Sequence, residues 1–545
     1  MITLPIDVQH MIADYIVTYE DLKALCVASK YFHSYVVPRL YKRIHLRLWD
    51  REHTDRFMES VAAGAGDKFR FTRTLVLEDI PMVAEPICDL TELRYLSECD
   101  WDEHRRGIDM TGEERESRMS ECLRLFPEHC LRRFCFVARR SLPIHIIEHL
   151  QNRQHAIDQL YCTSSLDLTP LFRNLRQLHI YLQSTAHLAH YLQHPHVFSE
   201  NIHELSFIYG PEDERDGSVL PDEFEVTKTL PNLKKVTLAG MDIRYAYRVG
   251  RGLIDSLDIS TLTHLSMLEC QGGNTFATGL GLIACKTEID LEHIALDLGW
   301  LAEDKEGSVE IYLGDLLAAG RHIKSLHLKW YCSTLGEALV DRICAIGPRL
   351  ESLSLQEGMD MYSVSPLNSR DLATIFKACP NLRQFGYQFG DEAYTNKDID
   401  ESIEDFVEAA KHLKELQMVH IRLSPYCTVG FASDEGQPEP NLILTQIQGA
   451  ANKIFRGLHR SCLKLDAIVF GHLVDFSTRQ DDGDWGPLPQ FCFIKAEQKD
   501  RLGRETAVGV PVSRALLRKT QPYTDILDMD PGSDGWDRWA WQATS

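Results

Sequence analysis

The side chains best placed to do chemistry are polar residues at fixed positions of a recurring apolar phrase. They supply imidazoles, amides and a lysine: Gln177, His179, Lys235, His264, His293, His327, Gln384 and Gln417. Neighbouring strands lie about 4.8 Å apart, so His264 and His293, which share a position one repeat apart, are expected to be adjacent. Two imidazoles are too few for a metal site, and Ser266 and Ala295 beside them supply no further ligand. We predict that this set forms a surface that binds a protein, without a metal or cofactor.

Sequence motifs for catalysis are absent. The glycines at 272–273 and at 279 and 281 lack the Lys-Ser/Thr pair that gives a phosphate-binding loop its chemistry. Neither a Gly-x-Ser-x-Gly turn nor a His-Glu-x-x-His helix occurs. A Ser-His-Asp triad needs its members to meet only in space, so the sequence leaves a triad open as an alternative. We predict that the protein is not an enzyme.

The phrase that positions the polar residues is Leu-x-x-Leu-x-Leu, with apolar residues at its first, fourth and sixth positions. It spans residues 131–136, 175–180, 202–207, 233–238, 262–267, 291–296, 323–328, 350–355, 382–387 and 413–418. From residue 202 onward the phrases begin 31, 29, 29, 32, 27, 32 and 31 residues apart. The phrase resembles that of leucine-rich repeats, whose usual period is slightly shorter, about 20–29 residues.

The alternation of apolar and polar residues in each phrase predicts a short strand. The segments between phrases predict helices, for example over residues 336–346 and 369–378. The resemblance to leucine-rich repeats therefore implies an α/β solenoid with a parallel sheet on its concave side. A doubly wound α/β fold is the alternative, but its strands are near-continuous apolar runs buried on both faces. Because these strands alternate with polar residues, we expect one face of the sheet to be exposed to solvent.

The first 46 residues predict three short helices. Apolar residues at helical spacing follow Pro5: Val8, Met11, Ile12 and Ile16. A second helix is predicted from Tyr19 to Val27, and a third begins after a Ser29 cap and ends at Pro38. Three such short helices cannot bury all of their apolar surface against one another. We expect the remainder to pack either in a groove of a partner or against the body of the same chain.

Four short motifs follow one another in this N-terminal segment. They are Leu4-Pro5-x-Asp7, Asp21-Leu22-x-x-Leu25, Val27-x-Ser29-Lys30 and Pro38-x-Leu40-Tyr41. In this order they resemble an F-box, the module that binds the Skp adaptor of cullin-RING ubiquitin ligases. The chain departs from the family pattern at Asp7, where Glu is usual, and at Tyr31-Phe32, where many members have Trp. An F-box at the extreme N-terminus before irregular repeats is similar to filamentous-fungal members of the family.

The resemblance implies the partners and the residues that contact them. It places six residues against the Skp adaptor, through which a cullin-RING ligase is reached: Leu4, Pro5, Ile12, Leu22, Leu25 and Val27. The remaining chain is then expected to hold an unknown protein substrate. One alternative is that the three helices only cap the solenoid. Two others are an interaction scaffold without a ligase role and a concave-face enzyme or small-ligand sensor.

Composition excludes several other classes of function. The net charge of −22 argues against binding nucleic acid or an anionic membrane surface, because both need neutralisation by Lys and Arg. No apolar run reaches the length of a membrane span, and the N-terminus lacks a basic leader. The 15 cysteines are scattered without a Cys-x-x-Cys pair, as in reduced proteins. We therefore expect a cytoplasmic or nuclear protein that is not secreted.

We predict three parts: an F-box-like helical module at 1–46, a leucine-rich-repeat-like solenoid at 47–476, and a C-terminal part at 477–545 that consists of an exposed loop at 477–490, a β-hairpin appendage and a polar tail. In the appendage, Phe491–Ile494 and Ala507–Val512 are expected to form a hairpin around a turn at Gly503. This hairpin is expected to be appended to the last repeat and to cap the open edge of the sheet. The polar tail that follows carries Trp536, Trp539 and Trp541, which are expected to pack on the solenoid or to form a binding peptide.

Overall fold

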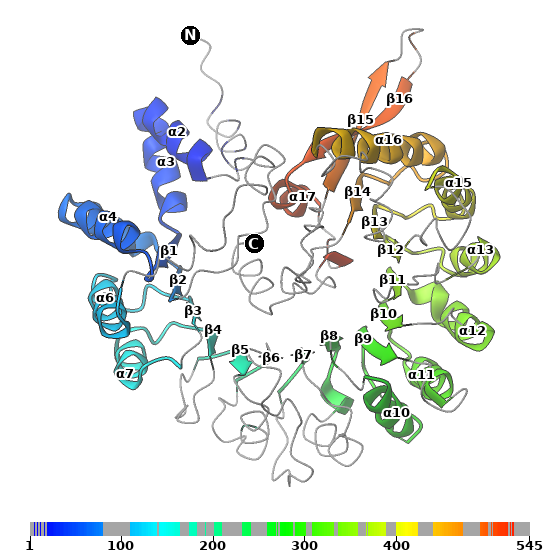
Figure 1. Ribbon diagram of the computed structural model, residues 1–545, viewed down its shortest axis with the longest axis horizontal. Helices are drawn as coiled ribbons and strands as arrows, with labels where there is room; N and C mark the ends of the chain where they lie inside the picture. Colours follow the sequence, from blue (N-terminus) through cyan, green and yellow to red (C-terminus); the bar gives the residue numbers. More distant parts are fainter. Residues whose placement is uncertain are drawn as a thin grey trace, which may run out of the picture.

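The computed structural model contains a mixed α/β fold built on one open sheet of 16 strands, which pair in the order in which they occur in the chain. The pairs from β1 to β14 are parallel, whereas β14–β15 and β15–β16 are antiparallel. The strands follow an arc whose ends do not pair with each other (Figure 1). Their bounds are β1 Arg43–Arg47, β2 Thr74–Glu78, β3 Arg133–Val137, β4 Gln159–Thr163, β5 Gln177–Leu182, β6 Glu204–Tyr209, β7 Lys235–Ala239, β8 His264–Leu268, β9 His293–Trp300, β10 Ser325–Tyr331, β11 Ser352–Glu357, β12 Gln384–Gln388, β13 Met418–Arg422, β14 Ala467–Phe470, β15 Phe491–Lys499 and β16 Glu505–Val512.

The structure describes most but not all of the chain. The described residues are 5, 8, 11, 13, 16, 19–79, 110–138, 141–163, 174–182, 191, 201–209, 232–240, 259–268, 270, 273–286, 289–300, 308–331, 336–357, 367, 369–388, 399–422, 440–471, 491–499, 503, 505–521, 524 and 526–527.

The described helices from α4 to α16 lie on the convex side of the arc, and α17 lies on its inner side (Figure 1). The α-helices are α2 Tyr19–Ala28, α3 Lys30–Leu40, α4 Arg51–Ala62, α6 Gly112–Arg124, α7 Ile144–Arg153, α10 Gly273–Ala284, α11 Ser308–Ala319, α12 Glu337–Ile346, α13 Ser369–Ala378, α15 Ile399–Ala410, α16 Pro440–Leu458 and α17 Arg514–Thr520. The 3₁₀ helices are η1 Ala65–Phe71, η4 Ile259–Thr261 and η5 Gly347–Arg349. The helices predicted over 336–346 and 369–378 are confirmed as α12 and α13.

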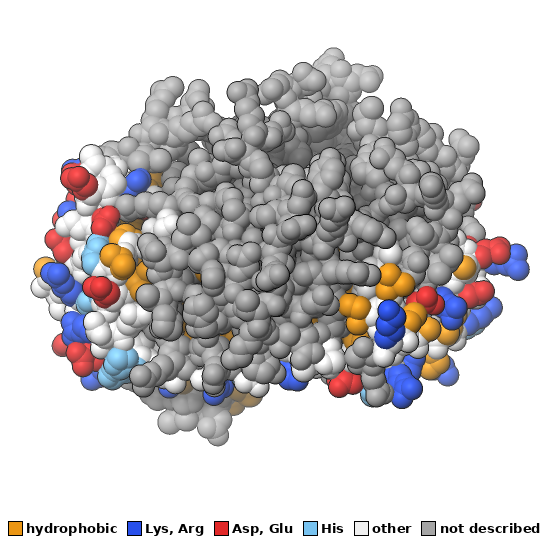
Figure 2. Space-filling view, turned by 90° about the horizontal axis from the view of Figure 1, so that it is seen from below, with side chains coloured by type: hydrophobic (Ala, Val, Ile, Leu, Met, Phe, Trp, Pro, Cys, Tyr) orange, Lys and Arg blue, Asp and Glu red, His pale blue; other side chains and the backbone are white. Residues whose placement is uncertain are grey.

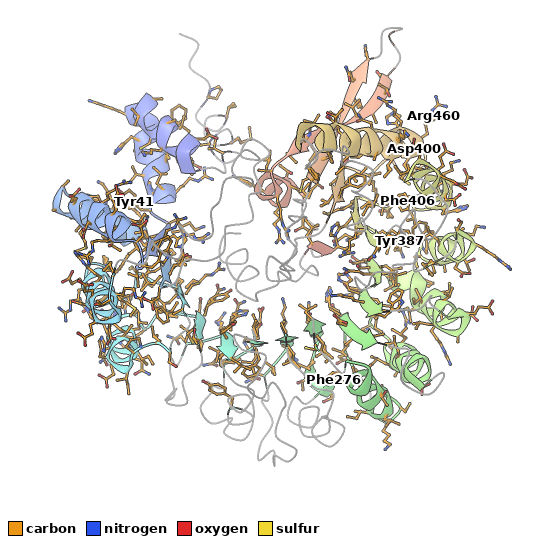
Figure 3. The ribbon with its side chains drawn as sticks, in the orientation of Figure 1. Tyr41, Phe276, Tyr387, Asp400, Phe406 and Arg460 are labelled. Carbon is orange, nitrogen blue, oxygen red and sulfur yellow. The ribbon has the colours of Figure 1, made fainter. Side chains whose placement is uncertain are left out.

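The hydrophobic core lies between the sheet and the convex helices. The fourth and sixth residues of every phrase except the one at 413–418 point into it, as Leu353 and Leu355 of β11 do, both with no exposed surface. Aromatic rings fill the space under the helices. The ring centroids of Phe406 on α15 and Phe385 on β12 are 6.1 Å apart. Phe406 and Tyr387 are labelled in Figure 3. Each such buried side chain contributes roughly 1.5–3 kcal/mol. One strand and one helix cannot enclose this core, so stability depends on contact between neighbours.

The N-terminal helices follow the predicted order with one correction. The prediction of a helix from Tyr19 to Val27 is confirmed by α2, and α3 begins directly after Ser29. Pro38 does not end α3, because Tyr41 donates to the carbonyl of Val37 at 3.1 Å beyond it. A proline removes only one hydrogen bond and is tolerated here in the last turn. Of the first predicted helix, residues 8, 11 and 13 are described, and they are helical.

The two ends of the sheet can be compared with the predicted domain limits. The boundary predicted between residues 46 and 47 falls inside β1, because Ile44 and Leu46 already belong to the core. The predicted C-terminal hairpin is confirmed: β15 and β16 pair with each other, and β15 continues the sheet from β14. Gly503 in the turn has φ +75°, a conformation that favours glycine. The loop expected at 477–490 and the three tail tryptophans lie outside the described residues.

Candidate functional site

The concave face, the sheet surface opposite the helices, carries the third, fifth and seventh residues of each phrase. Most of the fifth-position row is buried, including His179, Ala295, His327 and Ser354. The prediction that this face is exposed to solvent is therefore wrong for most of that row. The third-position row is more open in the middle of the arc, where Lys235 is exposed. A ligand can therefore contact only those residues of the third- and fifth-position rows that are exposed, or that become exposed when a chain segment covering them moves away.

The predicted contact between His264 and His293 is confirmed. Their strands pair in register, and the rings stack with centroids 4.0 Å apart. Burial, and then the neighbouring His293, lowers the pKa of His264 to about 3. Two stacked imidazoles have the chemistry of a flat hydrogen-bonding surface. Within the described part of the chain, no group of three or more His, Cys, Asp or Glu side chains is arranged to hold a metal ion.

The strands before this pair form a second stacked unit. His179 of β5 lies against Tyr161 of β4, with ring centroids 4.2 Å apart and planes within 4° of parallel. Gln177 is partly exposed and pairs in register with Glu204, which in turn faces Lys235. An amide, a carboxylate and an ammonium group thus lie side by side on β5, β6 and β7. Such a sequence of groups can hydrogen-bond a polar polypeptide.

The strands after the histidine pair hold their polar residues in internal hydrogen bonds. His327 Nε2 lies 3.0 Å from the hydroxyl of Ser325 and 2.8 Å from that of Ser352. Gln384 accepts through its amide oxygen a hydrogen bond from the backbone N–H of Ile526 at 3.0 Å. Of the predicted site residues, His327 therefore forms hydrogen bonds within the sheet, and Gln384 forms a hydrogen bond with the C-terminal segment of the chain.

The prediction that Gln417 lies on the concave face is wrong, because the phrase that contains it was placed in the wrong register. The phrase predicted at 413–418 begins three residues early, because β13 aligns Met418 with Gln384 and His420 with Gly386. Gln417 precedes the strand, and its carbonyl accepts from the N–H groups of Asp466 and Ala467. The fifth position of this repeat is His420, a buried residue that donates through Nε2 to the carbonyl of Gly471 at 2.8 Å.

The seventh-position row is a set of polar residues that the sequence phrase did not include. It runs across five consecutive strands: Asp297, Lys329, Gln356, Gln388 and Arg422. Lys329 and Asp297 form an ion pair at 3.4 Å. Arg422 has no exposed surface and donates to the hydroxyl of Ser354 at 3.0 Å. Both polar atoms of the Gln388 amide are buried without a hydrogen-bond partner. The sequence signal for this row was the alternation of apolar and polar residues, which continues past the sixth position of the phrase.

The N-terminal module presents several of the predicted adaptor contacts. Val27 is 84% exposed and Met11 55% exposed, which is unusual for large apolar side chains. Pro5 is exposed, and Leu22 and Leu25 are half-buried. Leu4 and Ile12 lie outside the described residues.

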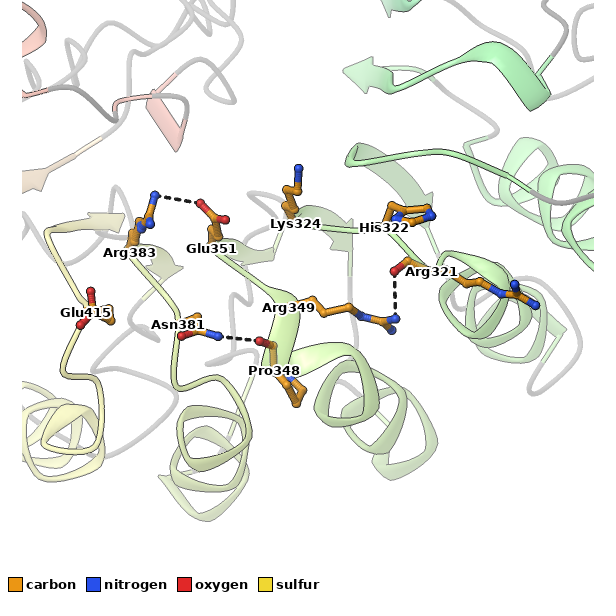
Figure 4. Close-up of a pocket in the computed structure, with 9 residues that line it drawn as sticks. All are labelled: Arg321, His322, Lys324, Pro348, Arg349, Glu351, Asn381, Arg383 and Glu415. Atoms are coloured by element: carbon orange, nitrogen blue, oxygen red, sulfur yellow. Dashed lines mark hydrogen bonds and ion pairs between the residues drawn. The ribbon is translucent and has the colours of Figure 1, made fainter.

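A pocket of about 330 Å³ lies at the end of the sheet where β10 to β13 begin (Figure 4). Its lining residues are Arg321, His322, Lys324, Pro348, Arg349, Glu351, Asn381, Arg383 and Glu415. Charges alternate along its wall, since Lys324 pairs with Glu292 at 2.9 Å and Arg383 with Glu351 at 3.0 Å. The hydrogen bond to Glu292 raises the pKa of Lys324. Exposed pairs of this kind contribute little stability, and they offer both signs of charge to a ligand.

Basic and acidic side chains lie interspersed on the described parts of the face in Figure 2. None of the described helices is both long and apolar enough to cross a bilayer.

No protein-family model matches the chain, and a search of curated proteins found no match.

Proposed function

We propose that the chain is the substrate-recognition subunit of an SCF-type ubiquitin ligase, in which an N-terminal F-box binds the Skp adaptor and degenerate leucine-rich repeats hold a protein substrate. The proposal rests on the four N-terminal motifs and on one structural observation. Val27, a position of the third motif, is an apolar side chain left 84% exposed. Exposed apolar surface on a short helical module is typical of a docking site.

The mechanism in this proposal is proximity and involves no catalysis by the chain itself. The arc provides a rigid frame, because every strand is hydrogen-bonded to its chain neighbours from β1 to β16. A substrate held on such a frame has its lysines at a high local concentration near the ligase-bound thioester. Work of this kind takes place in the cytoplasm or nucleus and requires neither a metal nor a cofactor.

The test is capture of the Skp adaptor and cullin from a lysate of the organism by full-length protein. Val27→Asp and the double change Leu4→Ala with Pro5→Ala are expected to reduce capture at least about tenfold, as loss of central interface contacts does. Leu463→Asp is the matched control, since Leu463 is 70% exposed at the opposite end of the sheet. Circular dichroism should be unchanged in every variant.

Two outcomes contradict the proposal. Capture that is unchanged in both N-terminal variants would leave the helices as a cap. Capture of the adaptor without cullin would favour the second candidate, a non-catalytic interaction scaffold, which the same polar concave rows support.

A further inference from the structure

The chain returns across its own concave face after β16. Ser513 caps α17 by accepting from the N–H of Leu516, and the helix turns inward (Figure 1). Leu517, Ile526 and Leu527 are fully buried in one apolar cluster with side chains of the concave face. The concave members are Met418, Ala467, Val469 and Cys492, with Ile494 and Val512 at the margin.

Side chains bind the backbone at both ends of the Ile526–Leu527 pair. The N–H of Ile526 donates to the Gln384 amide oxygen at 3.0 Å. Arg514, which is buried, donates to the carbonyl of Leu527 at 3.0 Å. Recognition of main-chain groups by fixed side chains is how a surface binds an extended peptide without regard to most of its sequence.

Gly386 makes room for the Ile526 side chain. A Cβ atom at residue 386 would lie 2.9 Å from Cδ1 of Ile526, 2.9 Å from Nη1 of Arg422 and 2.7 Å from Oγ of Ser354. Gly386 is not among the glycines with positive φ, so its backbone conformation is open to any residue. The glycine is therefore required for space: it leaves a depression in the sheet surface that a branched aliphatic side chain fills.

The neighbouring Gln388 points to a ligand larger than this pair. It lies two residues further along β12 on the same face, and its amide is buried with neither its donor nor its acceptor satisfied. Burying an amide without partners is unfavourable, and such a group usually has a water or ligand partner. The Ile526–Leu527 pair satisfies Gln384 and leaves Gln388 without a bond.

We propose that the concave surface of β11 to β13 around Gly386 is a peptide-binding subsite and that Ile526–Leu527 is an internal ligand occupying it. The external ligand is an extended protein segment whose branched aliphatic residue replaces Ile526 and whose backbone also reaches Gln388. Only the identity of that segment as a ubiquitylation substrate rests on the function proposed above. The internal ligand keeps the subsite closed until a better segment displaces it.

The test measures binding of a peptide in trans to the full-length chain. The probe is a fluorescent synthetic peptide with the sequence of residues 521–530, which leaves Arg514 and Leu517 on the receptor, and the read-out is anisotropy. Ile526→Asp with Leu527→Asp is the release variant, because burying two carboxylates in an apolar cluster is unfavourable. It should bind the peptide at least about tenfold more tightly than the unaltered chain, in which the tethered segment competes at a roughly millimolar effective concentration.

Two glycine substitutions in the release variant locate the site. Gly386→Leu should weaken peptide binding at least about tenfold, since the side chain fills the depression. Gly449→Leu is the control, because a Cβ there meets nothing within 4 Å, and it should leave binding unchanged. If the release variant does not fold, Ile526→Ala replaces it as an uncharged variant and should bind the peptide more tightly than the unaltered chain.

The proposal is overturned if a folded release variant does not bind the peptide, if it binds no better than the unaltered chain, or if both glycine variants bind equally. In those cases the C-terminal segment only covers the sheet. Neither adaptor nor cullin is present in the assay, so its failure leaves the proposed ligase role untouched. Conversely, failure of adaptor capture does not alter the peptide result.

Discussion

Replacing Gly386 by alanine should loosen the sheet locally by an amount that depends on Arg422. The guanidinium of Arg422 on β13 crosses residue 386 on β12 to reach Ser354 on β11. An added Cβ would lie closer than 3.0 Å to both Nη1 and Oγ, a separation that real Cβ atoms essentially never show. Arg422 must move and lose this hydrogen bond. The cost is about 1–3 kcal/mol of overpacking plus about 1.5–3 kcal/mol for a bond to a charged group, and we expect about 3 kcal/mol.

Hydrogen exchange measured by mass spectrometry on peptides from β11 to β13 is the suitable assay. A loss of about 3 kcal/mol corresponds to about a hundredfold faster exchange of amides that open locally. Strands β2 to β8 should exchange at unaltered rates, because each strand pairs only with its chain neighbours. Gly449→Ala should leave exchange the same or slower, since alanine favours a helix by about 0.5–1 kcal/mol over glycine.

A double-mutant cycle gives the result that would refute this reasoning. In an Arg422→Ala background the clash with Nη1 is gone, so Gly386→Ala should cost at least about 1 kcal/mol less. Equal costs in the two backgrounds would show that Arg422 does not lie across residue 386. Unchanged exchange in Gly386→Ala alone would show that the space above the glycine is not filled.

Three further predictions concern other parts of the sheet. The pKa of His264 is lowered to about 3, whereas the unfolded chain takes up that proton near pH 6.5, so stability falls as the pH drops from 6.5 towards 3. Urea midpoints at pH 7 and pH 5 should therefore differ less in His264→Phe, and an equal difference would contradict the shift. Cys285 is exposed while burial raises the pKa of Cys135 to about 12, so thiol labelling mapped by mass spectrometry should modify Cys285 before Cys135, and a fast reaction of Cys135 would contradict its burial. Leu353→Ala should cost about 2–5 kcal/mol in urea unfolding because Leu353 is fully buried, and a loss as small as that of an exposed leucine would be inconsistent with the core.

Local alternation was sufficient to predict most strands and several helices. The phrase at 350–355 corresponds to β11, and the helices over 336–346 and 369–378 have the predicted bounds within one residue. These elements depend on the spacing of apolar residues within ten positions, which a sequence displays directly. Among the strands that were not predicted, β4 also has a matching phrase, from Ile157 through Leu160 to Cys162, but β5 follows it too soon for the expected period.

The errors concern properties set by distant residues. Leu413, Leu416 and Met418 fit the phrase as well as Leu416, Val419 and Ile421 do, and only pairing with β12 chooses the second set. Exposure of the concave face likewise depends on a segment more than 100 residues away in sequence, as the bond between Gln384 and Ile526 shows. No periodicity within one strand carries that information.

The strictly sequential order of the strands has a consequence for synthesis on the ribosome. Each strand can pair with its predecessor as soon as it emerges, so the sheet grows from β1 without waiting for residues still to be translated. The subsite around Gly386 is complete once β13 has formed, but Ile526 appears only after roughly a hundred more residues. A nascent chain therefore displays an open subsite for several seconds, at about 5–20 residues per second, before its own C-terminus can fill it. During that interval the growing protein is exposed to premature partners.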